Sequence, residues 1–332
     1  MILPTLPRRA LLSSAVAALA MAAPSFAQDA AFPMTDENCG VTTVYEAPPQ
    51  RAVTLSNNAT EMLLALGLED SMAGTSYMAN LEISPDYAEA YATVPILSPL
   101  VATTEQLIEA EADFVYSGYP DGFSESRHTR DQLHDLGMKT RLNEEGCNLG
   151  PFGFAELFDE IHSVAAIFGV ADRGKALIEN LSGRLETVEA KLAGTDPIPV
   201  FIYNGGDAAP RAVLGNTLLS QAVEAAGGKN IFADVADRYG TVSWEQVAVR
   251  APEYVVVYYS GTASGQVVEN PATELGQARV DTLKTIPIIA DVPAVLNDRF
   301  ILINSVQAQP GPSTVDAVET MARAFHPDAF EE

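Results

Sequence analysis

The sequence contains few of the residues that most often carry catalysis or hold a bare metal ion. Its 332 residues include only four histidines, His128, His134, His162 and His326, and no Cys-x-x-Cys pair. A zinc or manganese site needs several His, Cys or carboxylate ligands at defined spacing. The histidines do not have that spacing, so we predict no metal ligands, no catalytic residues and no cofactor of the protein's own.

Phosphate-binding loops, nucleophile motifs and cations are also scarce. The chain has no G-x-S-x-G elbow, no G-x-G-x-x-G after a strand and no G-x-x-x-x-G-K-[ST] loop. Lys and Arg number 19 against 44 Asp and Glu, which gives a formal net charge of −25. Nucleic-acid binding requires cations that neutralise phosphates, so we expect no nucleic-acid partner.

The one long uncharged apolar run lies at the N-terminus. Arg8-Arg9 precedes Ala10–Ala23, and Ser25-Phe26-Ala27 has the small-x-small form of a cleavage site. This order predicts a signal peptide over residues 1–27, cleaved near Ala27, because the run is short and rich in alanine for a membrane span. The arginine pair is also typical of twin-arginine signals, although Pro7 stands where Ser or Thr is usual. Both export routes stay open.

The cysteine count is two, Cys39 and Cys147. An exported protein meets an oxidising compartment, where an even number of cysteines favours a disulfide. Closing a loop of about 100 residues stabilises the fold by ~4–5 kcal/mol in the chain-entropy model. Metal binding is the weaker interpretation, because no histidine lies nearby at ligand spacing.

Strand and helix patterns alternate in two blocks, with one long amphipathic helix between them. An apolar stripe recurs at steps of three and four residues and predicts that helix over residues 172–193; its members are Leu177, Leu181, Leu185, Val188 and Leu192. Strand–helix alternation is typical of parallel sheets covered by helices. We therefore predict an α/β protein of two Rossmann-like lobes, residues 28–168 and 195–332, joined by a connector helix within residues 169–194.

Aromatic and small polar residues follow the predicted strands, where open α/β sheets bind their ligands. Tyrosine offers an apolar face and a hydroxyl, which suits a large, partly polar small molecule. The residues at these strand ends are Tyr77, Tyr116, Tyr119, Tyr203, Tyr259 and Asn304. Trp244 either lines the same cleft or packs under a loop. Arg211 either pairs with a ligand oxygen or is a solvated loop residue.

Two short segments have a similar pattern, EQLIEAEADFV from Glu105 and EQVAVRAPEYV from Glu245. Thr103-x-x-Gln106 and Ser243-x-x-Gln246 precede the two helical patterns as capping boxes. A glutamate in a first helical turn favours the helix dipole, which explains each residue singly. Capping does not explain why both blocks place a glutamate at the same point.

These segments resemble the periplasmic substrate-binding proteins of ABC importers for iron–siderophores, haem and cobalamin. The resemblance covers about residues 39–328. It rests on Arg51–Ser56 with Ala59–Gly67, on Thr104–Val115, and on Ala225–Asn230 with Ser243–Val257. The connector helix and the closing helix at Val315–Glu319 also fit. The "NCG" and "EEGCN" contexts of the cysteines suggest a disulfide-bearing branch.

The resemblance implies the class III periplasmic fold, with a ligand enclosed between the lobes of a periplasmic monomer. It also implies that one glutamate on each lobe, here Glu105 and Glu245, docks to arginines of a permease dimer. Family contact positions fall near Asn57, Tyr77, Pro99, Tyr116, Tyr203, Trp244 and Tyr259, to which the strand-end analysis adds Tyr119, Arg211 and Asn304.

The expected function is capture of an iron–siderophore or related metal chelate for an ABC importer. A cobalamin or haem receptor of the same fold is the alternative. An exported α/β enzyme fits less well because no nucleophile or base is evident, and a bare-metal receptor is disfavoured by the histidine count.

Overall fold

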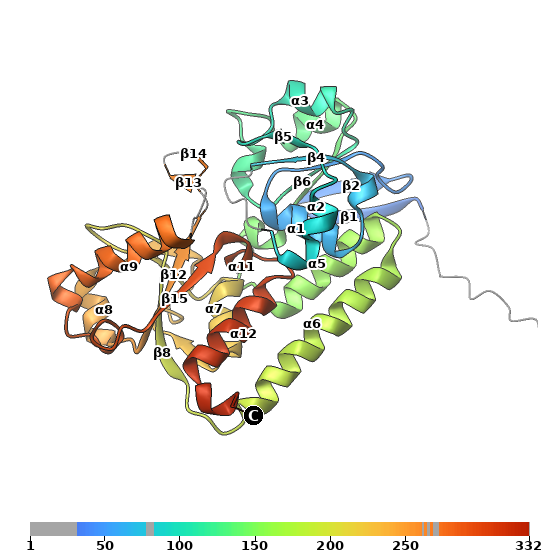
Figure 1. Cartoon of the computed structure of the whole chain (residues 1–332). Coiled ribbons are helices and arrows are strands. Elements are labelled where there is room, and N and C mark those ends of the chain that lie inside the picture. Colours follow the sequence, from blue (N-terminus) through green and yellow to red (C-terminus); the bar gives the residue numbers. More distant parts are fainter. Residues whose placement is uncertain (1–31, 78–82, 261, 264–265, 268–271, 332) are drawn as a thin grey trace, which may run out of the picture.

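The structure of the chain is a computed structural model (Figure 1), which describes residues 32–77, 83–260, 262–263, 266–267 and 272–331. The predicted signal peptide lies outside the described residues. Two α/β lobes are joined by one long helix, which confirms the expected fold class. No helix in the described ranges combines the length and apolar character needed to cross a membrane.

The N-lobe is built on a five-stranded parallel sheet in the order β5-β4-β3-β6-β7. Its central strand is short and fully buried, so helices cover both faces. The strands are β3 (Ala52–Thr54), β4 (Met72–Ser76), β5 (Ile96–Ser98), β6 (Phe114–Ser117) and β7 (Lys139–Leu142). The helices are α1 (Asn57–Ala65), α2 (Ala88–Tyr91), α3 (Thr104–Glu109), α4 (Arg130–Asp135) and α5 (Phe154–Ile167).

The C-lobe has a six-stranded sheet in the order β11-β9-β8-β12-β15, with β10 also paired to β8. Strands β8 (Ile198–Tyr203), β10 (Gly228–Asn230), β12 (Tyr254–Tyr259) and β15 (Phe300–Asn304) run parallel, whereas β9 (Arg211–Val213) and β11 (Tyr239–Thr241) are antiparallel. Its helices are α7 (Leu218–Ala225), α8 (Trp244–Arg250), α9 (Gln277–Lys284), α10 (Pro293–Leu296), α11 (Ser305–Ala308) and α12 (Thr314–Phe325).

The connector helix α6 (Ala171–Lys191) runs from one lobe to the other along the side of the molecule (Figure 1). Its predicted apolar stripe is shared between two cores: Leu181 belongs to the N-lobe core and Val188 to the C-lobe core. Arg184 binds Asp316 and Glu319 of α12 at 2.6 and 2.9 Å. The helix is therefore fixed to both lobes by packing, and to the C-lobe also by charge.

A hairpin of β1 (Met34–Asn38) and β2 (Val41–Tyr45) precedes the N-lobe sheet. The Cys39–Cys147 disulfide joins its turn to the short 3-10 helix η4 (Glu144–Cys147), with the two Cα atoms 5.1 Å apart. A second small hairpin, β13 (Thr262–Ala263) and β14 (Gln266–Val267), follows β12.

Candidate functional site

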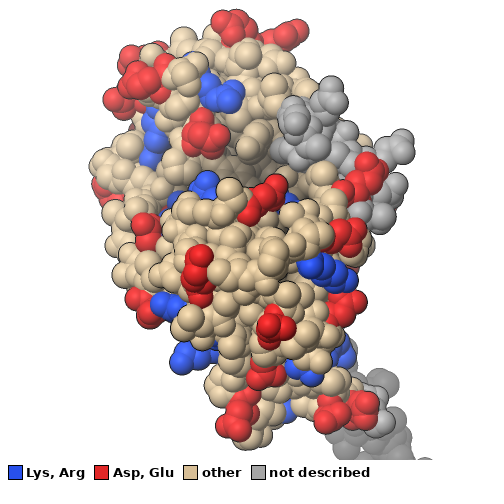
Figure 2. Space-filling view, turned by 90° about the vertical axis from the view of Figure 1, so that its left-hand side faces the viewer, with Lys and Arg blue, Asp and Glu red and all other residues tan. Residues whose placement is uncertain are grey.

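The space between the lobes opens at the carboxyl edges of both sheets. Figure 2 shows a hollow on this face, between the N-lobe above and the C-lobe below. Parallel strands of an open α/β sheet direct their following loops to one edge, so residues after β4, β6, β8 and β12 are brought toward this space. This is the region in which the sequence predicted a ligand cleft.

Four tyrosines from the two lobes meet there, and we call them the interlobe tyrosines: Tyr77, Tyr119, Tyr239 and Tyr258. In the N-lobe, Tyr77 follows β4 and its ring packs edge-on against that of Tyr119, with centroids 5.7 Å apart. In the C-lobe, the hydroxyl of Tyr258 accepts a hydrogen bond from Gln309 Nε2 at 3.4 Å. Burial, and then the Tyr258 and Tyr77 phenols, raise the pKa of the Tyr119 hydroxyl, so groups of the two lobes lie close together here.

The interlobe tyrosines remain protonated at neutral pH. Burial is the largest cause that raises the pKa of the Tyr119, Tyr239 and Tyr258 hydroxyls, and neighbouring phenols raise each of them further. A protonated phenol can donate a hydrogen bond to a ligand oxygen while its ring covers apolar atoms. The group is therefore suited to a ligand with both kinds of surface.

Arginines surround the same tyrosines from the C-lobe side. Arg211 and Arg238 both lie over the Tyr239 ring, each with its guanidinium carbon 5.5 Å from the centroid. Arg279 of α9 donates to the backbone carbonyl of Tyr258. This local concentration of cations contrasts with the acidic chain as a whole, and it provides partners for a carboxylate or a metal-bound oxygen.

Three predicted aromatic ligand contacts lie in the cores instead. The Tyr116 hydroxyl donates to Glu160 Oε1 at 2.6 Å and its side chain is fully buried in the N-lobe. Tyr203 is equally buried and its hydroxyl donates to the Gly206 carbonyl at 3.3 Å. Trp244 packs against Tyr203 and donates its indole N–H to the Asp207 carbonyl at 3.0 Å. The structure does not bring these three to the interlobe tyrosines.

The other predicted contacts are divided between the interlobe region and local structural roles. Asn57 opens α1 and is 5% exposed, and neither amide atom of its side chain has a hydrogen-bond partner within the described part of the chain. Asn304 caps α11 by accepting the Gln307 N–H at 2.9 Å. Pro99 is exposed after β5. Tyr259 is 6% exposed and faces Gly276.

Tyr239, Tyr258 and Gln309 were not among the predicted ligand contacts, although Tyr258 stands at one of the predicted strand ends. Tyr258 stands next to the predicted Tyr259, and neighbouring strand residues point to opposite faces of a sheet. Both faces of β12 are buried, so no polar alternation in its sequence, YVVVYY, shows which tyrosine faces which side. Tyr239 lies on β11, a three-residue strand with no recognisable pattern.

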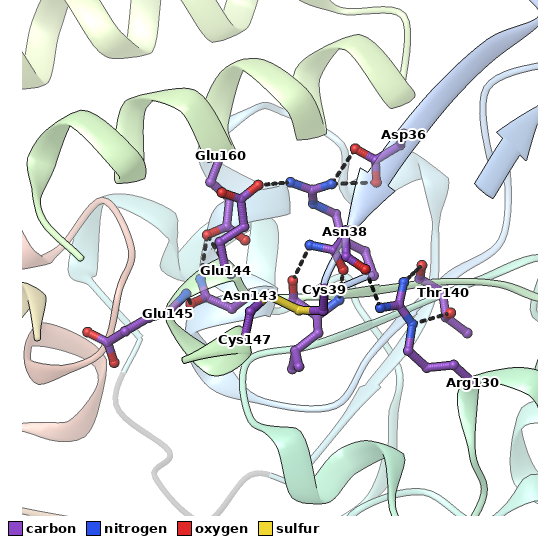
Figure 3. The surroundings of a disulfide bond; sticks show 12 residues. Asp36, Asn38, Cys39, Arg130, Thr140, Asn143, Glu144, Glu145, Cys147 and Glu160 are labelled. Carbon is purple, nitrogen blue, oxygen red and sulfur yellow. Dashed lines mark hydrogen bonds and ion pairs between the residues drawn. A yellow bond between two sulfur atoms is a disulfide. The ribbon is translucent and has the colours of Figure 1, made fainter. Parts of the chain in front are cut away.

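A buried polar network lies behind the cleft, around the disulfide (Figure 3). Arg141 is fully buried and binds Asp36 and, at 2.7 Å, Glu144. Glu160 accepts hydrogen bonds from Tyr116 and, at 2.8 Å, from Asn143. Burial outweighs these partners and raises the pKa of Glu160 to about 7. The network attaches the N-terminal hairpin to the N-lobe sheet.

The two predicted docking glutamates occupy matching positions on different lobes. Both capping boxes form as expected, with Thr103 and Gln106 around the start of α3 and Ser243 and Gln246 around the start of α8. Glu105 and Glu245 are exposed residues of these first turns. Backbone N–H groups and the cap hydroxyls lower the pKa of both carboxyls, so both are charged at neutral pH.

A bare metal ion finds no ready site in this region or elsewhere in the described chain, where no three His, Cys, Asp or Glu residues converge. His128 is buried against Thr104, beside a pocket of about 250 Å³ that Glu105 also lines. Burial lowers the pKa of this histidine.

Curated proteins with similar sequences include cobalamin- and vitamin B12-binding proteins. A curated cobalamin-binding protein of Halobacterium salinarum is 24% identical over 89% of this chain and 74% of its own length. A vitamin B12-binding protein of Photorhabdus laumondii is 25% identical over 71% of this chain and 80% of its own length.

Solved structures agree with the fold. A periplasmic binding protein of Veillonella parvula matches with a TM-score of 0.78 at 25% identity, over 89% of this chain and 97% of its own. An Fe3+-hydroxamate transport protein of Saccharomonospora viridis matches with a TM-score of 0.69 at 24% identity, over 89% and 99%. The profile described as "Periplasmic binding protein" matches residues 53–306. The chain therefore belongs to the periplasmic binding protein family.

Proposed function

We propose that this protein is a periplasmic receptor that encloses an iron–siderophore or related metal chelate between its lobes and delivers it to an ABC importer. The observation that carries the proposal is the meeting of Tyr77 and Tyr119 of the N-lobe with Tyr239 and Tyr258 of the C-lobe. A ligand bound at this point contacts both lobes at once, so its binding and their closure are coupled. No covalent step is part of the function.

The chemistry of the region favours a bulky, oxygen-rich ligand. Protonated phenols donate to ligand oxygens, and Arg211 and Arg238 supply charge at one end of the group. The unpartnered amide of Asn57 at the start of α1 adds a donor and an acceptor. Organic chelates of iron present this mixture of apolar framework and polar oxygen atoms.

Cobalamin is the second candidate, and the sequence relatives favour it. Proteins described as cobalamin- or vitamin B12-binding are 24–25% identical to this chain over most of its length. Haem is a third ligand of the same general class, since a heme-binding protein of Roseiflexus matches with a TM-score of 0.66. All three are large, partly apolar metal chelates.

A titration of the purified protein separates these ligands. Ferrioxamine B, cyanocobalamin and haemin are added in turn and followed by calorimetry, with Zn²⁺ as the bare-metal comparison. We expect one chelate to bind and Zn²⁺ not to bind. Binding of Zn²⁺ alone would contradict the proposal, and turnover of a chelate by the isolated protein would favour an enzyme.

A pair of variants on one strand tests the location of the site. Tyr258→Phe removes a hydroxyl of the interlobe tyrosines, and we expect binding of the selected chelate to weaken about 3- to 10-fold. Tyr254→Phe is the matched control, because Tyr254 lies at the other end of β12 and donates to the Ala324 carbonyl. Equal affinities for both variants and the wild type would place the ligand elsewhere.

Docking to a permease dimer is assigned to Glu105 and Glu245, one exposed carboxylate on each lobe. We expect Glu105→Ala and Glu245→Ala to reduce uptake through the cognate permease, and the double variant to reduce it most, with chelate affinity unchanged. Glu109→Ala, an exposed acid on the same helix as Glu105, is the control. Unchanged uptake in the double variant would reject this role.

Export is assigned to residues 1–27, with cleavage near Ala27 and a periplasmic monomer as the product. Intact mass and N-terminal sequencing of the exported protein test the cleavage site. Light scattering tests the monomer. Retention of residues 1–27 in the exported protein would contradict the assignment.

A further inference from the structure

Glu145 is an N-lobe residue whose carboxylate is directed to the C-lobe. One oxygen, Oε1, accepts the backbone N–H of Leu218, the first residue of α7, at 2.8 Å. The other, Oε2, accepts from Arg238 Nη2 at 2.8 Å. Among the ion pairs of the described residues, this pair alone joins the side chains of one lobe directly to those of the other. We call Glu145, Leu218 and Arg238 the interlobe contact.

The N-lobe side of this contact is held by the disulfide. Glu145 lies in η4, two residues before Cys147, which is bonded to Cys39. Its backbone N–H is donated to Asn143 Oδ1 at 3.2 Å. In Figure 3 the Glu145 side chain extends away from the disulfide and from the buried network around Glu160. The carboxylate is thus presented to the other lobe by a loop with little freedom.

The C-lobe side leads directly to the interlobe tyrosines. Arg238 lies over the ring of its neighbour Tyr239, and its Nε is buried with no hydrogen-bond partner in the described part of the chain. Burial, the Glu145 carboxylate and the Tyr258 phenol all raise the pKa of Tyr239, which places it beside Tyr258, and Gln309 donates to the Tyr258 hydroxyl at 3.4 Å. Any displacement of Arg238 therefore changes the environment of two of the interlobe tyrosines.

The exposed fractions show that this is not a surface ion pair. The Glu145 side chain is 2% exposed and that of Arg238 is 16% exposed. A buried carboxylate that loses its cation is strongly disfavoured, so the pair favours the arrangement in which the lobes are together. Opening the lobes must return both charges to water and must free the Leu218 N–H.

From these contacts we infer that Glu145 is a positioning residue for ligand binding: it holds the lobes together and fixes Arg238 and Tyr239 at the cleft, and the Cys39–Cys147 disulfide keeps it in place. The part that concerns the ligand rests on the proposed function, whereas the contact between lobes does not. Reduction of the disulfide should consequently loosen α7 in the other lobe, although neither cysteine belongs to that lobe.

Amide hydrogen exchange of the full protein tests the contact without any ligand. In Glu145→Ala the Leu218 amide loses its acceptor, and we expect it to exchange about tenfold faster or more. Glu253→Ala is the matched control, because Glu253 pairs with Arg299 at 3.3 Å within one lobe. Unchanged exchange at Leu218 in Glu145→Ala would overturn the inference. If that variant does not fold, Arg238→Gln, which leaves the disulfide loop intact, is measured in the same way.

Two further measurements test the disulfide and the ligand separately. The Cys39→Ser/Cys147→Ser variant should also speed exchange at Leu218, and continued protection there would overturn the role of the disulfide. For whichever of ferrioxamine B, cyanocobalamin or haemin binds the wild type, Glu145→Ala and Arg238→Gln should speed dissociation about tenfold, with association within about twofold. Unchanged dissociation would overturn the positioning role. If none of the three binds, the proposed function fails and the exchange measurement still decides the contact.

Discussion

Glu61 predicts how the stability of this protein depends on pH. This residue of α1 is fully buried, and the Ser313 hydroxyl of the C-lobe donates to its carboxylate. Hydrogen bonds from Ser313 and from the backbone of Ser84 favour the charged form, but burial is the larger influence. The Asp316 carboxylate acts in the same direction as burial, and together they raise the pKa of Glu61 from 4.5 to about 7.

The sign and size of the effect follow from the two pKa values. Between pH 4.5 and pH 7 the folded state holds a proton on Glu61 that the unfolded state has released. The free energy of unfolding therefore falls as pH rises through this window, and it becomes level above pH 7. A separation of about 2.5 pKa units corresponds to ~3 kcal/mol. Glu160, whose pKa is also raised to about 7, adds a change of the same sign.

Guanidinium denaturation of wild type and Glu61→Gln at several values from pH 4.5 to pH 8 measures the contribution of Glu61 to the pH dependence of the free energy of unfolding. Glutamine resembles the protonated acid, so we expect the variant to lose ~3 kcal/mol less than the wild type over this range. Glu109→Gln, at an exposed position of α3, is the control for the loss of one acid. Parallel curves for wild type and Glu61→Gln would refute the reasoning.

Three further predictions concern the disulfide, the connector and a close helix contact. The Cys39→Ser/Cys147→Ser variant lacks the bridge between two residues that are 108 positions apart in the sequence. It should lower the free energy of unfolding by ~4–5 kcal/mol in denaturant titrations. A loss below ~1 kcal/mol would contradict the chain-entropy estimate. Arg184→Met should lower the free energy of unfolding by ~1–2 kcal/mol in the same assay, because it removes the ion pairs from α6 to Asp316 and Glu319 in a partly exposed network. If the variant is as stable as the wild type both in buffer and in 1 M salt, the network contributes nothing to stability. Gly174→Val should cost ~1–3 kcal/mol, since a Cβ there meets the Ala165 Cβ at 2.5 Å between α5 and α6; Gly183→Val, where a Cβ meets nothing within 4 Å, should cost less.

Long apolar patterns made much of the fold predictable. The short apolar runs FVYS and YVVVYY have the length and β-branched and aromatic content typical of buried strands, and they form β6 and β12. The connector helix was also predictable, because an amphipathic helix buries one face and therefore carries an apolar stripe along its length. The antiparallel strands β9 and β11 were not predicted, since three residues do not establish a period. The hairpin β1–β2 was missed as well.

The candidate site was less predictable, because it depends on where each side chain points and not only on where the residue lies in the sequence. Strand ends locate a residue near the cleft, but alternation decides whether its side chain enters it. Tyr116 and Tyr203 stand at strand ends and point into the cores. The interlobe contact is harder still to foresee, since it depends on Glu145 meeting residues 73 and 93 positions later in the chain. The residues next to Glu145 in the sequence give no indication of contacts with residues so far along the chain.

The position of Trp244 gives the protein an internal optical reporter. It is the only tryptophan in the chain. Its indole is anchored to the Asp207 carbonyl in the loop after β8, and its backbone opens α8, directly before Glu245. Emission from this single fluorophore therefore senses whether the loop at the sheet edge and the exposed helix move relative to each other. Without any label, a fluorescence titration can thus reveal whether events at the cleft reach the surface around Glu245, where docking to a permease is proposed.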